Sequence, residues 1–306
     1  MAKPNISDFG PKEKKLVTLE QGDICVAATY REGEVDIRRN VGEGRVLVLD
    51  SDLKPKGALW TGETGLVLGL ALARSTSDLY VSDASSQTVK RFTEDGNNLR
   101  DFDAMQGKTF GSIEVSESGD YYLAEHIYGE AFPFIGGGNI HQFDVNGNKV
   151  AEFDTERDPG KFGFHGVTNM FLTDGDSRMV YISETGTRVM QYDLKGNKQL
   201  ADLFDLADGT GDRVTAGISK VTTDTMLLSH VYGVSLMGFD GKVIKDYDIA
   251  KDRGWAAVKT LADNKHFLIA NFFSGRIEKR HLETGALVAE IDTGMPYTVA
   301  CMAEIK

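Results

Sequence analysis

Four polar side chains in the sequence are of the types that perform acid–base or metal chemistry. His165 lies in the segment GFHGVTN, immediately ahead of an apolar run, and Glu125, Glu184 and His230 each end an apolar run elsewhere in the chain. A histidine that titrates near neutrality beside a carboxylate forms a general acid–base pair. Histidine nitrogens and carboxylate oxygens also ligate Zn²⁺ and other transition metals. We expect all four residues to be catalytic, and we expect His165, His230 and Glu184 to be the ligands if a divalent metal is bound.

An internal repeat relates these positions to one another. The segment LYVSDASSQTVKRFTEDGNNLRDF at 79–102 has a relative in VYISETGTRVMQYDLKGNKQLADLF at 180–204, and further copies lie at 121–153, 227–247 and 267–291. Each copy holds an apolar strand, a polar link, an alternating strand, a turn rich in Asp, Asn or Gly, and a short final strand. Another apolar run precedes each copy, so the unit contains four strands. That is the composition of one propeller blade.

The two ends of the chain supply a sixth blade. Residues 297–306 read as a lone innermost strand, and 23–30, 44–50 and 57–60 read as the three strands that follow one. Joining them closes the ring and removes a free sheet edge. The sequence therefore predicts an all-β fold, a six-bladed β-propeller with four strands per blade. It forms one domain over 1–306, with an N-terminal extension at 1–21.

The closing blade places the two cysteines, Cys25 and Cys301, on neighbouring strands. They form either a closing disulfide or two buried thiols, and a reducing compartment favours the thiols.

The bulk composition limits the partners. The net charge of −12 argues against nucleic acid and against an anionic membrane surface, because both need a basic face. No apolar run is long enough to span a bilayer, and the start MAKPNISDFGPKEKK lacks the apolar core of a secretory signal. No nucleotide-binding motif is present, so no nucleotide cofactor is expected. These features predict a soluble cytoplasmic protein with a small-molecule substrate, and they leave the oligomeric state open.

We expect the candidate side chains to gather at one mouth of the central channel. Within a blade, the start of the innermost strand and the end of the second strand meet at the same end of the channel. His165 is expected to begin the innermost strand of the third complete blade, and Glu184 to end the second strand of that blade. The alternative is that the carboxylates at these strand ends accept hydrogen bonds from the following turn. Three other histidines fall at outer-strand or turn positions and are expected to be solvated: His141, His266 and His281.

The segment 126–139 is an insertion that is expected to form a lid. It contains IYGEAFPFIGGGN, in which several apolar side chains precede three glycines, and it should fold over the mouth. An apolar wall with a few convergent polar groups is typical of a small-molecule pocket, although about half of the aromatic residues are expected to pack between blades. The residues expected to bind the substrate are His126, Asn271, Asp83, Phe132, Phe134, Phe164, Trp255 and Phe272.

The pattern LYVSDASSQTVKRFTEDG resembles the NHL-repeat propellers and the broader superfamily of gluconolactonases, calcium-dependent phosphotriesterases and strictosidine synthase. The resemblance covers nearly the whole chain and implies the six-bladed fold. The calcium ligands of the lactonases have no counterpart at the inner-strand starts. The zinc-binding PHG-like motifs of the peptidyl-hydroxyglycine amidating lyases are matched once, by His165-Gly166.

These observations predict an enzyme of lyase, hydrolase or isomerase type that acts on a small apolar or aromatic molecule at the channel mouth. His and carboxylate side chains would supply acid–base or metal assistance. The competing hypothesis is a non-enzymatic propeller that serves as a scaffold for binding a ligand or a protein.

Overall fold

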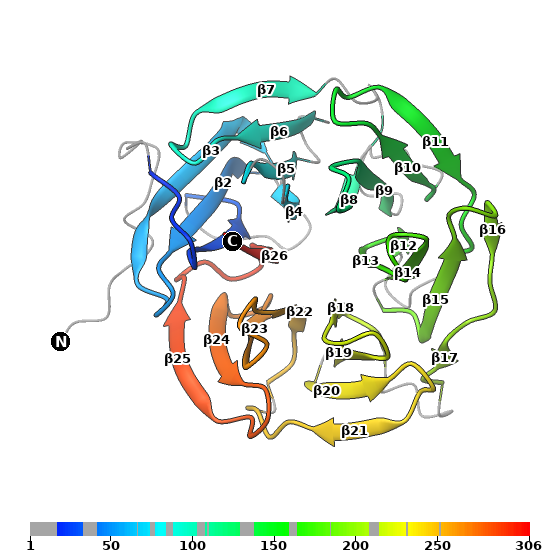
Figure 1. The fold of residues 1–306 in the computed structure, drawn as a ribbon. Coiled ribbons are helices and arrows are strands. Elements are labelled where there is room, and N and C mark those ends of the chain that lie inside the picture. Colours follow the sequence, from blue (N-terminus) through cyan, green and yellow to red (C-terminus); the bar gives the residue numbers. More distant parts are fainter. Residues whose placement is uncertain are drawn as a thin grey trace.

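The computed structural model describes residues 17–32, 42–65, 67–73, 77–83, 88–102, 108, 110–128, 138–158, 164–183, 185–207, 214–230, 232–250 and 252–306. The regular elements in these residues are all β-strands. They form six small antiparallel sheets arranged in a ring around a central channel (Figure 1). The predicted all-β, six-bladed propeller is confirmed.

Each blade is numbered here by its order in the chain, and its strands are given from the channel outwards. Blade one holds β4 (Val67–Leu72), β5 (Leu79–Asp83), β6 (Thr88–Phe92) and β7 (Asn98–Phe102). Blade two holds β8 (Phe110–Val115), β9 (Tyr121–Tyr128), β10 (Ile140–Phe143) and β11 (Lys149–Phe153). Blade three holds β13 (Asn169–Thr173), β14 (Arg178–Ile182) and β15 (Arg188–Asp193), with an outer strand in two pieces, β16 (Lys198–Gln199) and β17 (Phe204–Asp205).

The remaining blades follow the same plan. Blade four holds β18 (Gly217–Lys220), β19 (Thr225–His230), β20 (Gly233–Gly238) and β21 (Val243–Asp246). Blade five holds β22 (Trp255–Thr260), β23 (His266–Asn271), β24 (Arg276–His281) and β25 (Leu287–Asp292). Blade six holds β26 (Val299–Glu304), β1 (Ile24–Ala28), β2 (Gly42–Leu49) and β3 (Pro55–Gly65). The short strand β12 (Phe164–Gly166) pairs with β9 of blade two.

Blade six closes the ring by joining the two ends of the described chain. β26 pairs with β1 in an antiparallel ladder that sets Ala27 opposite Cys301 and Cys25 opposite Ala303. The two cysteines therefore lie on neighbouring strands, as predicted, and both are free thiols. Burial raises the pKa of each thiol above its ordinary value, so both remain protonated at neutral pH.

The hydrophobic core lies between the blades. One cluster joins Leu227 and Val234 of blade four to Trp255, Phe267 and Ile269 of blade five, and equivalent clusters lie at the other blade interfaces. Burial of each such side chain stabilises the fold by about 1.5–3 kcal/mol. Because each cluster uses side chains from two blades, neighbouring blades stabilise each other.

The turns rich in Asp, Asn and Gly are held by their own side chains. Between β10 and β11, the Asp144 carboxylate accepts hydrogen bonds from the backbone N–H groups of Asn146 and Asn148, both at 2.9 Å. Gly147 follows at a positive φ of 87°, a conformation that glycine adopts without strain. These contacts are the physical reason for the repeated turn composition in the sequence.

A β-bulge recurs at the start of the outermost strand. In blades one, two, four, five and six, one extra residue interrupts the ladder to the third strand, and these residues are Leu99, Val150, Ile244, Val288 and Lys56. Val150, Ile244 and Val288 are 57%, 56% and 52% exposed. A bulge leaves its extra residue unpaired and increases the local twist of the strand. The rim of the propeller is therefore twisted at the edge where another strand would add.

The described part of the chain contains no helix that is long and apolar enough to cross a membrane.

Candidate functional site

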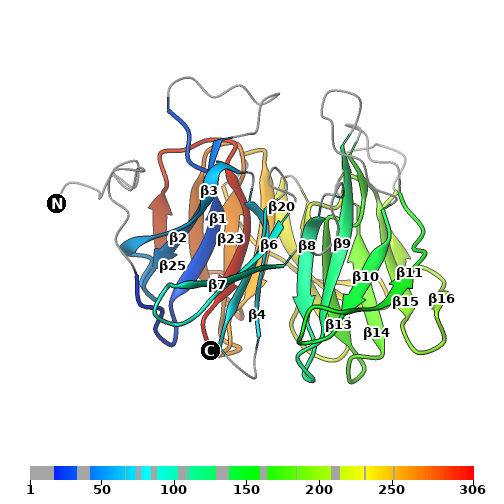
Figure 2. The same cartoon turned by 90° about the horizontal axis from the view of Figure 1, so that it is seen from above.

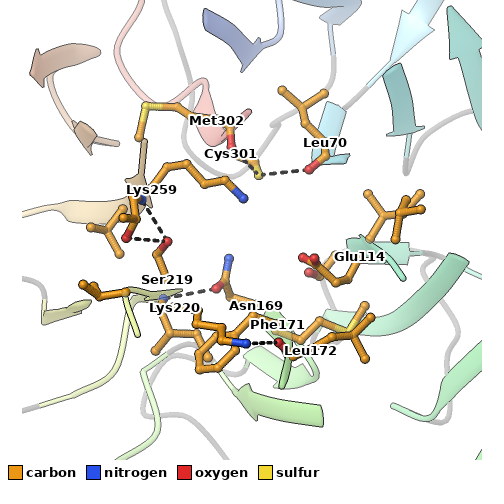
Figure 3. Close-up of a pocket in the computed structure, with 18 of the residues that line it drawn as sticks. Leu70, Glu114, Asn169, Phe171, Leu172, Ser219, Lys220, Lys259, Cys301 and Met302 are labelled. Carbon is orange, nitrogen blue, oxygen red and sulfur yellow. Dashed lines mark hydrogen bonds between the residues drawn. The ribbon is translucent and has the colours of Figure 1, made fainter. Parts of the chain in front are cut away.

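The central channel holds a cavity of about 270 Å³ that is lined by all six innermost strands (Figure 3). The lining residues include one or more from each blade, among them Leu70, Glu114, Asn169, Ser219, Lys259 and Cys301. The lining also includes Glu117, Asp176 and Lys306, which follow the innermost strands β8, β13 and β26. The cavity therefore reaches the end of the channel at which the innermost strands finish, the end where the C-terminus lies (Figure 2).

Asn169 presents the N–H₂ of its amide to the channel. The Asn169 Oδ1 accepts a hydrogen bond of 3.1 Å from the backbone N–H of Ile218 in the next blade. Because the oxygen is engaged, the two amide donors point away from that contact, and the nitrogen is directed into the cavity (Figure 3).

Hydroxyl groups join blades four and five beside this amide. The Ser219 Oγ accepts a hydrogen bond of 2.9 Å from the backbone N–H of Thr260, and it lies 3.2 Å from the Thr260 Oγ1. Lys220 donates in the other direction, to the Leu172 carbonyl of blade three at 3.4 Å. These contacts fix the wall from which the neighbouring side chain of Lys259 extends into the channel (Figure 3).

Lys259 and Glu114 bring opposite charges into the channel from opposite sides. Lys259 belongs to β22 of blade five and Glu114 to β8 of blade two. Blades two and five stand across the ring from each other, with two blades between them on either side (Figure 1). Both charged groups are directed towards the middle of the channel (Figure 3).

Cys301 adds a neutral thiol to the same wall. Its Sγ lies 4.0 Å from the Leu70 carbonyl oxygen of blade one. Burial raises the pKa of the thiol, although the nearby Lys259 ammonium opposes this rise. A protonated thiol is a weak nucleophile, so Cys301 forms a passive part of the lining.

His165 lies in a different strand from the one predicted. The structure places it in β12, whose three residues pair with the end of β9: Phe164 with Tyr128, His165 with Ile127 and Gly166 with His126. The innermost strand of blade three begins only at Asn169. The prediction that His165 begins that strand is therefore wrong.

The reason is that β9 continues beyond the residue that pairs with β8. Phe110 faces Glu125 at the end of the β8 ladder, and residues 126–128 offer a further edge to which β12 adds. The predicted roles of the His165, His126 and Phe164 side chains lie outside what the structure describes.

Glu125 is fully buried and all its contacts are within the protein. Its Oε1 accepts hydrogen bonds from the His141 Nε2 at 2.5 Å and from the Lys108 ammonium, and its Oε2 accepts one from the Gly138 N–H at 2.9 Å. Burial alone would raise the pKa of the carboxyl, but the hydrogen bonds from His141 and Lys108 outweigh it and lower the pKa to about 2. Glu125 thus holds Gly138, which lies shortly ahead of β10, against β9.

His141 is buried and not solvated as expected. It lies on β10 with no exposed surface, facing Leu123 across the ladder to β9. Its Nδ1 is 3.6 Å from the Glu152 Oε2. The prediction is wrong because this outer-strand position lies against the buried Glu125, whose carboxylate forms a hydrogen bond with the ring. By contrast, His266 and His281 are partly exposed, and their rings are in edge-to-face contact.

His230 ends β19 as predicted, and its ring is hydrogen-bonded within its own blade. The His230 Nε2 lies 3.3 Å from the Ser235 Oγ, and Ser235 donates a 2.5 Å hydrogen bond to the Asp246 carboxylate.

Glu184, Phe132 and Phe134 lie outside the described residues.

Asp83 and Asn271 make structural contacts at the ends of their strands. The buried Asp83 carboxylate accepts a 2.5 Å hydrogen bond from Thr61 of blade six. Asn271 accepts hydrogen bonds from the N–H groups of Phe273 and Ser274, each at 3.0 Å, and donates to the Arg253 carbonyl at 3.0 Å. Asn271 therefore caps the turn that follows its strand.

The predicted aromatic wall separates into a core residue and a surface cluster. Trp255 is fully buried between blades four and five, and its indole N–H donates to the Ala250 carbonyl at 2.9 Å. Phe272 belongs to a surface cluster with Phe273 and Tyr297, whose ring centroids lie 5.6 to 6.1 Å apart. Phe273 is 38% exposed. The cluster lies at the end where β22 and β26 begin, away from the turns that line the cavity.

Among the described residues, no group of three or more His, Cys, Asp or Glu side chains is placed to hold a metal ion. Two of the three predicted ligands depend on the side chains of Glu184 and His165, so the metal site stays a prediction.

Sequence reasoning missed Lys259, Glu114 and Asn169. The residues predicted from the sequence lie near the starts of innermost strands or the ends of second strands. Asn169 begins β13, but Lys259 and Glu114 lie within β22 and β8 and line the cavity. The signal was a charged residue within a short apolar run, as in WAAVKTL at 255–261 and FGSIEV at 110–115.

No family model and no curated protein matches the sequence. Solved structures do resemble the fold. A chain of the crystal structure of a nidogen/laminin complex superposes with a TM-score of 0.63 at 12% identity, covering 93% of this chain and 98% of that one. A protein of unknown function from Bacteroides caccae gives a TM-score of 0.65 at 10% identity, covering 94% and 100%. At these identities the likeness shows the fold alone, and membership of the NHL-repeat or gluconolactonase-like families stays a prediction.

Proposed function

We propose that this propeller binds a small molecule bearing a carboxylate in its central channel. The observation that supports the proposal is the convergence of two donors, the Lys259 ammonium and the Asn169 amide N–H₂, on one cavity (Figure 3). An ammonium and an amide that meet from two blades are complementary to the two oxygens of a carboxylate.

The surroundings of these donors favour binding. The cavity of about 270 Å³ lies just below the range of about 300–1,000 Å³ typical of pockets for drug-sized ligands. It is therefore of a size for a small metabolite. A charge-assisted hydrogen bond inside a protein cavity is stronger than the same contact in water, because the walls screen it less. Because many of the lining residues are polar, we propose a polar ligand where the sequence predicts an apolar one.

Calorimetry with short carboxylates tests this proposal. We expect wild-type protein to bind propanoate or butanoate saturably and to show no binding of the corresponding alcohols. Lys259→Met should weaken carboxylate binding about 10- to 100-fold, since a hydrogen bond to a charged group contributes about 1.5–3 kcal/mol. Lys242→Met, which removes an 81% exposed lysine on a surface turn, is the matched control and should bind normally. Equal binding by wild type and Lys259→Met would refute the proposal.

Catalysis at the opposite end of the channel is a second proposal. Its support is the hydrogen-bonded series His230, Ser235 and Asp246, which orients an imidazole at a strand end. In this proposal His165 and His230 act as acid, base or metal ligand. Elemental analysis of protein purified without chelator should find a transition metal that the double variant His165→Ala, His230→Ala loses. Equal metal content in both proteins would rule out His165 and His230 as metal ligands.

A further inference from the structure

We infer that His266 and His281 form a binding site for a divalent transition metal on blade five, and that Cu²⁺ is the ion bound most tightly. β23 begins at His266, β24 ends at His281, and the ladder between the two strands sets these residues directly opposite each other. Side chains at such opposed positions project from the same face of a sheet. The site lies outside the channel cavity described above.

The backbone pairing brings the two imidazole rings close together. The His281 N–H donates to the Ala286 carbonyl at 2.9 Å, and the His266 carbonyl accepts from the Leu261 N–H at 3.0 Å. These groups point away from the shared ladder, and such a non-hydrogen-bonded pair has the closer side chains. The ring centroids are 5.4 Å apart. Two imidazoles that each bind one metal at about 2.0–2.1 Å have centroids roughly 4.5–6 Å apart, so the spacing fits a shared ion.

Asp263 fixes the His266 ring in the tautomer that a metal requires. Its Oδ2 lies 2.6 Å from the His266 Nδ1, and its Oδ1 accepts hydrogen bonds from the N–H groups of Lys265 and His266 at 2.8 and 3.0 Å. Burial raises the pKa of this carboxyl, but the hydrogen bonds from His266 and Lys265 outweigh it, so the pKa lies below its usual range. The ionised carboxylate holds the ring proton on Nδ1, which leaves the lone pair on Nε2. A carboxylate in this position is the common partner of a metal-binding histidine.

His281 is the ligand that adjusts on binding. Its Nδ1 accepts a hydrogen bond from the Thr284 N–H at 3.3 Å, beyond the usual range for such contacts. In this contact the neutral ring carries its proton on Nε2. Metal binding at Nε2 moves that proton to Nδ1 by exchange with water, with no net change in protons, and it gives up only the long contact to Thr284. Because the ring is partly exposed, both tautomers can be solvated.

The charges near the pair favour a cation. Lys279 lies on the same face of β24, where its ammonium donates to the Ser51 carbonyl of blade six at 2.8 Å. Lys265 adds a second positive charge in the turn ahead of β23. Three carboxylates belong to the same turns and to the adjoining strand β26, where one of them accepts a hydrogen bond from the Ala262 N–H: Asp263, Glu283 and Glu304. The carboxylates therefore outnumber the ammonium groups.

The two imidazoles determine which ion is selected. Among the described residues no third His, Cys, Asp or Glu joins the pair to form a larger group, so water supplies the remaining ligands. Imidazole nitrogen suits Cu²⁺, Ni²⁺ and Zn²⁺, and of these Cu²⁺ binds a given nitrogen site most tightly. Mg²⁺ and Ca²⁺ require oxygen ligands, which the pair does not provide.

Electron paramagnetic resonance of untagged protein titrated with Cu²⁺ tests the inference. We expect a bound Cu²⁺ whose spectrum shows coupling to two imidazole nitrogens and does not change on addition of Mg²⁺. His266→Ala and His281→Ala should each remove one nitrogen from the spectrum and weaken Cu²⁺ binding, measured by calorimetry, about tenfold or more.

A matched pair of aspartate variants tests the positioning role of Asp263. Asp263→Asn keeps an oxygen for the N–H groups of the turn but removes the charge behind the His266 ring, and it should weaken Cu²⁺ binding about 10- to 100-fold. Asp240→Asn is the control, because Asp240 accepts a hydrogen bond from the Lys242 N–H at 3.1 Å in a similar turn. Asp240→Asn should bind Cu²⁺ as the wild type does.

An unchanged spectrum in the double variant His266→Ala, His281→Ala would overturn the inference, since the Cu²⁺ would then be bound elsewhere. Absence of Cu²⁺ binding by the wild-type protein would also overturn it. Modification by diethyl pyrocarbonate, mapped by mass spectrometry, gives a test on wild-type protein alone, because Cu²⁺ should protect both rings. The site shares no residue with the channel cavity or with His165 and His230, so its failure leaves both functional proposals unchanged.

Discussion

At the scale of single residues, Glu125 shows how a strongly shifted carboxyl can serve structure. Its pKa is lowered to about 2, the kind of shift that often marks a functional site, yet both of its oxygens accept hydrogen bonds from the protein. It joins His141 of β10, Lys108 ahead of β8 and Gly138 ahead of β10. The geometry assigns it to holding blade two together.

This arrangement predicts a pH dependence of stability. The folded pKa lies below the unfolded value near 4.5, so the ionised carboxylate stabilises the fold at neutral pH, and this contribution is lost as pH falls from about 5 towards 2. Glu125→Gln should lower the free energy of unfolding by about 2 kcal/mol at pH 7 and much less at pH 3. Urea denaturation at both values measures this. An equal loss at both pH values, or a loss as large in the exposed control Glu283→Gln, would contradict the role.

At the scale of the strand, residues of the same type differ widely in exposure, depending on whether they lie at a bulge or in the core. Ile244 in β21 and Ile269 in β23 are both aliphatic residues within short strands, yet Ile244 is 56% exposed at a bulge and Ile269 is 0% exposed in the core. Ile269→Ala should cost about 2–5 kcal/mol and Ile244→Ala less than about 0.5 kcal/mol. Urea unfolding of the two variants makes the comparison. A large loss from Ile244→Ala would show that the bulge residue packs against other side chains.

Predictions about the strands are confirmed where they depend on local sequence signals. Alternating apolar residues and turn chemistry are local signals, and they place the second strand ends at Asp83, His230 and Asn271. The position of His165 depends on pairing between β12 and the extended β9, a long-range contact that no local pattern encodes. Burial of His141 likewise depends on its partner Glu125 in the neighbouring strand. The fold could therefore be predicted, and the side-chain environments could not.

At the scale of the whole molecule, closure depends on one strand. β26 covers β1 on the channel side, and Val299 and Met302 lie in a core cluster with residues of blade five. The ring also determines the site, because Lys259 and Glu114 face each other only when six blades complete the circle. A pattern read along the sequence does not reveal such a pair, since its members come from different repeats.

Removal of β26 should therefore prevent folding of the whole ring. A variant that ends at residue 296 exposes the inner edge of β1 and two core clusters, and it should lose its cooperative thermal transition. Addition of a synthetic peptide of residues 297–306 should restore it, as followed by circular dichroism. A truncated protein that melts cooperatively near the wild-type temperature would show that five blades and a partial sixth suffice.

The ladder between β1 and β26 also has a consequence during translation. β1 leaves the ribosome among the earliest strands, and its channel-side partner is synthesised only after the other five blades. Contacts between residues so far apart in sequence form slowly, because a long loop must close first. The inner edge of β1 in the nascent chain thus lacks its β26 partner until the last of the described strands is synthesised. A nonsense mutation ahead of the codons for β26 would release a chain whose channel cannot be completed.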